Sequence, residues 1–199
     1  LSKNEVTDNA QMYLSYALNT LNSLNDKMLI ITHKGFKLSL QKICSDSRIR
    51  FTHWGNHIGK NDWSDCNIVM LIGWNLIPQK EHIFNVFNAI RNEDISSYAI
   101  DKEVLKNFQN TQLADDLIQG IMRSQARKIG TKDGDCKKTK VYLFYEEVKL
   151  YNEVLDIVFS EFPKCNVMDW SPIGISKKVK KTKRNNNADI VISYLQEQE

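Results

Sequence analysis

The chain has 199 residues, of which 42% are hydrophobic and 26% are charged, and its formal net charge is +3. These fractions are typical of a globular protein and exclude disorder throughout, while the length fits one ordinary domain with an appendage. So small a net charge permits nucleic-acid binding without demanding it, because the distribution of charge matters more than its sum.

The hydrophobic pattern predicts helices and strands that alternate along the chain. In chain order we expect a helix over 3–24, a strand over 27–33, a helix over 36–46, strands over 48–54 and 67–73, and helices over 79–90, 100–110 and 111–128. A strand over 139–147, a helix over 151–162, a strand or irregular turn over 165–174 and a helix over 188–199 complete the chain.

This alternation predicts an α/β fold with a mainly parallel sheet. We expect a first domain over residues 1–150 and a small basic C-terminal extension over 151–199. Ligands of such sheets gather at the carboxyl ends of the strands, where we expect the polar loop 55–66 and helix 111–128 to meet.

One face of the expected helix 111–128 carries long polar side chains, among them two arginines. Gln119, Arg123 and Arg127 recur every four residues, so a helix would present all three together, either to solvent or to an anion. The alternative is an ordinary surface pair of Arg123 with Asp115 or Asp116.

Several classes of site are missing from the sequence. Neither a phosphate-binding glycine loop nor a nucleophile motif is present. The cysteines, at 44, 66, 136 and 165, lie far apart and are expected to be reduced, and glycines interleave His53 and His57, so we expect no metal site. No apolar run approaches the roughly 20 residues that span a bilayer. Because the chain begins at Leu1 without a secretory signal, we expect a piece of a longer, cytoplasmic protein.

Three segments occur in the order of known helicase motifs. They are KMLIITHKGF at 27–36, THWGNHIGKNDWSDCNIVMLIG at 52–73 and DDLIQGIMRSQAR at 115–127. They resemble motifs IV, V and VI of superfamily 2 helicases, and so the second RecA-like lobe of such a motor, over roughly residues 25–145. The likeness is closest to helicases of phages, plasmids and other mobile elements.

The resemblance implies roles for individual residues. Gln119, Arg123 and Arg127 fall on motif VI, whose side chains reach ATP held by the first lobe, and the arginines would stabilise charge on the transferred phosphoryl group. Gly59 and Asn61 match the Gly-x-Asp/Asn of motif V. The end of the motif IV strand, which holds strand phosphates in the family, is Thr32, His33 and Lys34.

The match to the family is incomplete at two positions. Ile58 stands where many relatives have Arg before the motif V glycine, and Met122 replaces the motif VI glycine. The second arginine of motif VI also falls one residue late, at Arg127. Purely structural roles stay open for several of these residues. His33 could simply end a strand and Asn61 could supply a turn conformation. The tryptophans could be packing residues rather than platforms on which bases stack; they are Trp54, Trp63 and Trp74.

The function expected from the resemblance is the C-terminal motor lobe of an ATP-dependent DNA helicase or translocase. ATP with Mg²⁺ would be bound mainly by an absent N-terminal lobe of the same parent chain, so this chain alone should not hydrolyse ATP. The nucleic acid is expected to be DNA rather than RNA. A dense basic run is expected to contact it through phosphates, and it consists of Lys177, Lys178, Lys180, Lys181, Lys183 and Arg184.

Two other functions stay open at this point. One is a stand-alone αβ module that binds nucleic acid without ATP. The other is a Rossmann-like transferase with its ligand pocket at the HWGNHIGKND loop, residues 53–62.

Overall fold

The computed structural model describes residues 3–78, 81, 83, 102–132, 134–146, 149–169 and 188–195. Most of the helix expected over 79–90 and all of the basic run 177–184 lie outside these residues.

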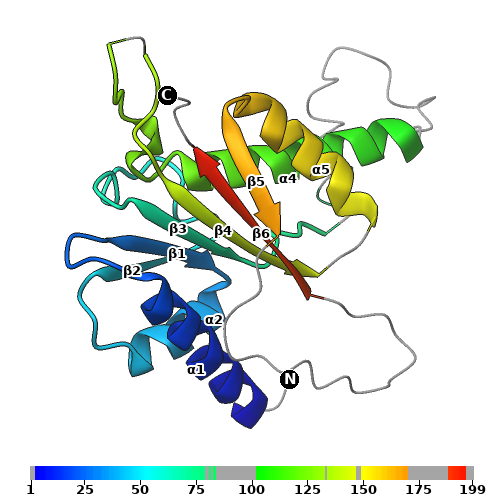
Figure 1. Ribbon diagram of the computed structural model, residues 1–199. Coiled ribbons are helices and arrows are strands. Elements are labelled where there is room, and N and C mark those ends of the chain that lie inside the picture. The colour runs from blue at the N-terminus through cyan, green and yellow to red at the C-terminus, as the bar shows by residue number, and fades with distance from the viewer. Residues whose placement is uncertain are drawn as a thin grey trace.

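The described part contains a six-stranded sheet in the order β2-β1-β3-β4-β6-β5 (Figure 1). Its strands are β1 (Met28–Thr32), β2 (Ile49–His53), β3 (Ile68–Ile72), β4 (Lys140–Glu146), β5 (Cys165–Asp169) and β6 (Ala188–Leu195). The four strands β2, β1, β3 and β4 run parallel, whereas β6 is antiparallel to both β4 and β5. The parallel part, flanked by helices, is Rossmann-like and confirms the expectation of an α/β fold.

Helices cover both faces of the sheet. They are α1 (Lys3–Thr20), α2 (Lys34–Ile43), α4 (Lys102–Ile121) and α5 (Lys149–Glu161). Helices α1 and α2 pack on one face and α4 and α5 on the other (Figure 1). None of the helices in the described ranges is both long and apolar enough to cross a membrane.

The central strands are apolar on both faces, as their continuous hydrophobic runs require. In β1, Met28 and Ile30 belong to the core under α1 and α2, while Leu29 and Ile31 belong to the core under α4 and α5. The second core also takes in three buried tryptophans, which confirms that they are packing residues; these are Trp54, Trp63 and Trp74.

Two sequence-based expectations about the elements are wrong. Residues 188–195 form strand β6 instead of a helix, and β-branched Ile190, Val191 and Ile192 suit a strand that pairs on both sides. The helices expected over 100–110 and 111–128 are one helix, α4, which ends at Ile121. Strands β5 and β6 join the same sheet as β1–β4, so the described part of the expected extension adds to that sheet.

Candidate functional site

The site is built on the connection between β2 and β3, residues 54–67. Both strands run in the same direction, so this connection must return from the carboxyl end of β2 to the amino end of β3. It does so through a series of turns rather than a helix. Gly55 and Gly59 take φ values of 83° and 75°, a conformation that glycine adopts readily and other residues rarely. Buried Trp54 and Trp63 fix the loop to the face covered by α4.

Both arginines of the motif VI-like segment reach this loop. Nη1 of Arg123 donates to the main-chain carbonyl of Lys60 at 3.1 Å, and Nη1 of Arg127 donates to Oδ1 of Asn61. Arg123 is half-buried and its Nε finds no hydrogen-bond partner in the part of the chain that the structure describes, whereas Arg127 and Asn61 are exposed. Two segments separated by more than 60 residues therefore meet at loop residues 60 and 61.

Contrary to the sequence-based prediction, neither arginine belongs to the α-helix that carries Gln119: α4 ends at Ile121, Arg123 lies in the turn that follows, and Arg127 ends a short 3₁₀ helix. After Ile121 the chain enters a turn, and Ser124 starts the short 3₁₀ helix η2 (Gln125–Arg127). The Ser124 hydroxyl donates to the carbonyl of Ile121 at 2.7 Å and accepts from the amide of Ala126 at 3.1 Å, which replaces continued α-helical bonding. Gln119 is half-buried in the last turn of α4, and within the described residues its side chain forms no hydrogen bond with the loop.

The arginine pair lies toward the amino ends of the strands, not at the carboxyl ends as expected. The amide of Gln125 donates to the carbonyl of Cys66, just before β3, and the amide of Lys140 donates to the carbonyl of Asn67. The reason is topological: α4 runs antiparallel to the strands that it connects, so its last residues return to the amino ends. Arg123 also forms no ion pair with Asp115 or Asp116 within the described part of the chain.

The motif IV-like residues occupy the opposite edge of the sheet. Thr32 is buried at the end of β1, where it pairs with His53, and its carbonyl accepts from the amide of Trp54 at 3.0 Å. His33 and Lys34 are exposed at the start of α2. Burial lowers the pKa of His53, and the positive charges of Lys37, Lys34 and Lys60 lower it further. Cationic side chains therefore gather at this carboxyl edge.

A buried polar group beneath the loop was missed by the sequence-based reasoning. His57 is fully buried, its ring meets that of Trp54 edge-on at 5.5 Å, and among the described residues neither ring nitrogen reaches hydrogen-bonding geometry, although the main chain of His53 and of Asp116 interacts with the ring. Asp116 projects from the buried side of α4 and accepts from Nδ2 of Asn75 at 2.8 Å. An acidic residue on the apolar stripe of Leu113 and Leu117 was the signal that could have revealed it.

The electrostatics of this group favour neutral forms. Burial lowers the pKa of His57, an effect opposed by the nearby Asp116 and reinforced by Arg123. Burial raises the pKa of Asp116, against the hydrogen bond from Asn75 and the charge interaction with His57. Among the described residues, no group of three or more His, Cys, Asp or Glu side chains is placed to hold a metal ion.

One apolar cavity of about 20 Å³ lies between the sheet and helices α4 and α5. It is lined by Leu71, Leu117, Ile121, Val141, Leu143, Leu155, Val158 and Phe159. All of these side chains are apolar, so this space has no group to orient a polar ligand.

No protein-family model matches the sequence, and no curated protein matches it. Among solved structures, the chain matches a protein-(glutamine-N5) methyltransferase (release factor-specific) from Alicyclobacillus acidocaldarius. The match is at 11% sequence identity with a TM-score of 0.34, over 96% of this chain and 90% of the methyltransferase chain.

Proposed function

We propose that the chain is the C-terminal RecA-like motor lobe of an ATP-dependent DNA helicase or translocase. The observation that carries this proposal is the contact of Arg123 and Arg127 with Lys60 and Asn61. The contact joins the motif V-like loop to the motif VI-like segment, two segments that the resemblance assigns to one nucleotide site.

The arginine pair suits an anion docked against the loop. Guanidinium groups stay cationic at all physiological pH values and present several donors in one plane. Arg127 is exposed, as are Gly59 and Asn61, so a phosphate group can reach them from outside the lobe. ATP with Mg²⁺, held by the first lobe, would supply the phosphoryl group. Arg123 and Arg127 would stabilise the charge that develops on it, and Gln119 lies four residues before Arg123, in the last turn of α4.

The carboxyl edge of the sheet suits the nucleic-acid strand. Exposed His33 and Lys34 stand at the start of α2, where main-chain N–H groups also favour phosphate. Nucleotide and strand would then occupy opposite edges of the sheet, joined by the loop. Within the loop, Nζ of Lys60 donates to Oδ1 of Asn56 at 3.0 Å, and Nδ2 of Asn56 donates to Oγ1 of Thr52 at 3.2 Å.

A nucleic-acid-binding module without ATP is the second candidate. The cationic carboxyl edge favours it, because that surface needs no second lobe to attract a strand. The transferase alternative has less support: the perturbed acid and base, Asp116 and His57, are buried beneath the loop, and His57 has no exposed surface for a substrate.

The deciding experiment measures DNA-stimulated ATP hydrolysis by this lobe joined to the preceding part of its parent protein. Arg123→Ala should lower turnover by roughly a hundredfold or more while nucleotide binding is largely kept, because a guanidinium acting on the transition state contributes orders of magnitude in rate. Arg123→Lys keeps the charge and loses the planar donors, so it should recover only part of the rate.

Arg48→Ala is the matched control. Arg48 pairs with Asp46 at 2.7 Å and donates to the carbonyl of Ser23, and within the described residues it forms no hydrogen bond with loop residues 59–61, so its loss should leave turnover within a few-fold of wild type. Unchanged turnover in Arg123→Ala, with normal folding, would overturn the motor-lobe proposal and leave the binding module as the better account.

A further inference from the structure

The described residues of the segment after the arginine pair, 128–132 and 134–138, form a basic hairpin that the proposed function does not use. Ile129 and Cys136 form an antiparallel bridge. The amide of Lys137 donates to the carbonyl of Lys128 at 2.8 Å, and the amide of Gly130 donates to the carbonyl of Asp135 at 2.6 Å. These bonds define a two-stranded ribbon, which Figure 1 shows extending past the amino end of β4.

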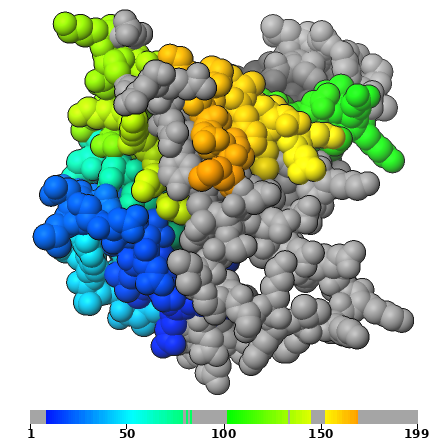
Figure 2. Space-filling view, in the orientation of Figure 1, coloured from blue at the N-terminus to red at the C-terminus, as the bar shows by residue number. Residues whose placement is uncertain are grey.

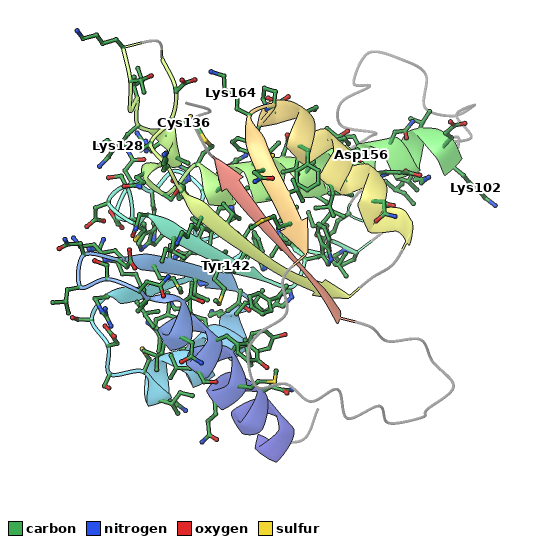
Figure 3. All side chains as sticks on the ribbon, in the orientation of Figure 1. Lys102, Lys128, Cys136, Tyr142, Asp156 and Lys164 are labelled. Atoms are coloured by element: carbon green, nitrogen blue, oxygen red, sulfur yellow. The ribbon has the colours of Figure 1, made fainter. Side chains whose placement is uncertain are left out.

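The ribbon stands out from the body of the molecule. Figure 3 places Lys128 and Cys136 on it, at the end of the molecule away from α1, and Figure 2 shows the same yellow-green segment projecting at the upper left. Nε2 of Gln125 donates to the carbonyl of Lys138 at 2.5 Å and ties the base of the ribbon to η2. The ribbon is therefore held by hydrogen bonds at its base, and it follows Arg127 directly in the sequence.

The ribbon concentrates positive charge. The ribbon 128–138 holds four Lys and two Asp residues, and Arg127 and Lys140 flank it, so residues 127–140 carry six of the chain's 27 Lys and Arg residues and two of its 24 Asp and Glu residues. One of these two acids, Asp135, already pairs with Lys164 at 2.6 Å. Lys128, Lys132, Lys137 and Lys138 are all exposed, and within the described ranges none of them forms an ion pair.

The placement of two lysines indicates an anionic ligand. The bridge and hydrogen bonds set Lys128 directly opposite Lys137, on the same face of the ribbon. Like charges in this arrangement repel one another and weaken the pairing of the two strands. In the absence of a ligand, the hairpin would therefore be more stable if one of the two lysines were neutral. A phosphate between the two ammonium groups would remove the repulsion and bind both.

We propose that the ribbon 128–138 binds the sugar-phosphate backbone of nucleic acid. Lysines act on phosphates as point charges, so the contact should not depend on base sequence. A two-stranded ribbon can also lie along a duplex groove, where it meets phosphates on both sides. This contact does not depend on a role of Arg123 or Arg127 in ATP hydrolysis.

The test measures binding of the full chain to a fluorescent 20-base-pair DNA duplex by anisotropy, at several salt concentrations. The variant Lys128→Ala/Lys137→Ala removes the opposed pair and keeps the main-chain bonds of the ribbon. The control Lys42→Ala/Lys102→Ala removes the same net charge from two exposed lysines elsewhere, and Figure 3 shows Lys102 at the far side of the molecule from Lys128.

Loss of two phosphate contacts should reduce the slope of log K against log salt by about 2 and weaken binding at low salt by roughly tenfold or more. The control should keep the wild-type slope, and Lys128→Arg/Lys137→Arg should bind like wild type. The proposal is overturned if the alanine pair and the control behave alike. It is equally overturned if the loss is the same at every salt concentration, which would indicate a structural defect. Wild-type behaviour of the alanine pair would leave an acidic protein surface as the ligand to seek.

Discussion

Asp65 anchors the loop that carries the candidate site, and Asp65→Asn should loosen that anchor. Its carboxylate accepts from Nζ of Lys27 at 2.7 Å and from both terminal nitrogens of Arg50, at 2.7 and 3.0 Å. Lys27 immediately precedes β1, and Arg50 belongs to β2 and also donates to the main-chain carbonyl of Asp62 at 2.8 Å. One carboxylate therefore connects two strands to the end of the loop.

The size of the effect follows from the pKa of Asp65. The hydrogen bond from Lys27, with that from Arg50 and its charge, lowers this pKa from 3.8 to about 2 against the effect of burial. At 1.36 kcal/mol per unit this difference corresponds to roughly 2.4 kcal/mol. The side chains of Asp65 and Lys27 are 39% and 44% exposed, so screening by solvent reduces the contribution to about 1 kcal/mol.

The sign of the pH dependence is fixed by the direction of the shift. A carboxyl group with a lowered folded-state pKa stabilises the protein above its unfolded-state pKa and loses that contribution as the pH falls toward the folded-state value. The difference in stability between wild type and Asp65→Asn should be about 1 kcal/mol at pH 7. It should shrink as the pH falls from about 5 toward 2.

Urea unfolding at pH 7, 5 and 3.5 would measure the difference, and thermal unfolding should show a lower Tm by about 3 °C. Asp62→Asn is the matched control, since Asp62 lies in the same loop and, within the described residues, its carboxylate forms no ion pair. A difference that is independent of pH would refute the electrostatic reasoning. An equal loss in Asp62→Asn would refute the assignment of the anchor to Asp65.

Two further predictions concern the edges of the site. Gly73 has φ of 75°, and a Cβ there would lie 3.2 Å from Nε2 of His33. Gly73→Ala should therefore lower the free energy of unfolding by about 1–2 kcal/mol, measured by thermal unfolding, and displace His33. Gly35→Ala, in α2 with open space around the added carbon, should leave the Tm unchanged or raise it. Because burial raises the pKa of Asp116, the folded protein loses stability as the pH rises above 3.8, so Asp116→Asn should be at least as stable as wild type at pH 7. A lower urea midpoint for this variant at pH 7, with no difference near pH 4, would show instead that the folded protein needs the charge beside His57.

Local sequence patterns were sufficient for the parallel core. The runs at 27–33, 48–54, 67–73 and 139–147 contain β1, β2, β3 and β4. The reason is clearest for β1 and β3, which are buried at every position and therefore read as continuous hydrophobic runs. The same local patterns failed at 188–195. Pairing of β6 with both β4 and β5 decides its conformation, and such pairing with residues distant in sequence leaves no periodic signal within the segment.

For the candidate site, too, the sequence predicted some features correctly and others wrongly. Resemblance to known motifs predicted that Asn61, Arg123 and Arg127 belong to one site. The structure places Arg127 against Asn61 and Arg123 against the neighbouring carbonyl of Lys60, and their functional role stays a prediction. Spacing alone placed the two arginines on a helix and at the wrong edge of the sheet. The helix ends early because the Ser124 hydroxyl bonds to local main-chain groups, and this competition depends on side-chain geometry that a pattern of apolar residues does not contain.

The contact of Arg123 with a main-chain carbonyl has a consequence for how the site works. Its acceptor belongs to Lys60, whose side chain turns instead toward Asn56 and the carboxyl edge. The position of the loop is therefore tied to the arginine through the backbone and to the opposite edge through a side chain. The loop between β2 and β3 has no regular main-chain hydrogen bonding, so individual contacts keep it in place. These are the hydrogen bonds of Arg123 and Lys60, the ion pairs of Asp65 and the packing of the buried tryptophans. If the proposed anion drew Arg123 away from the carbonyl, the loop would lose one of these bonds, and less free energy would be needed to move the loop near His53 and Lys60.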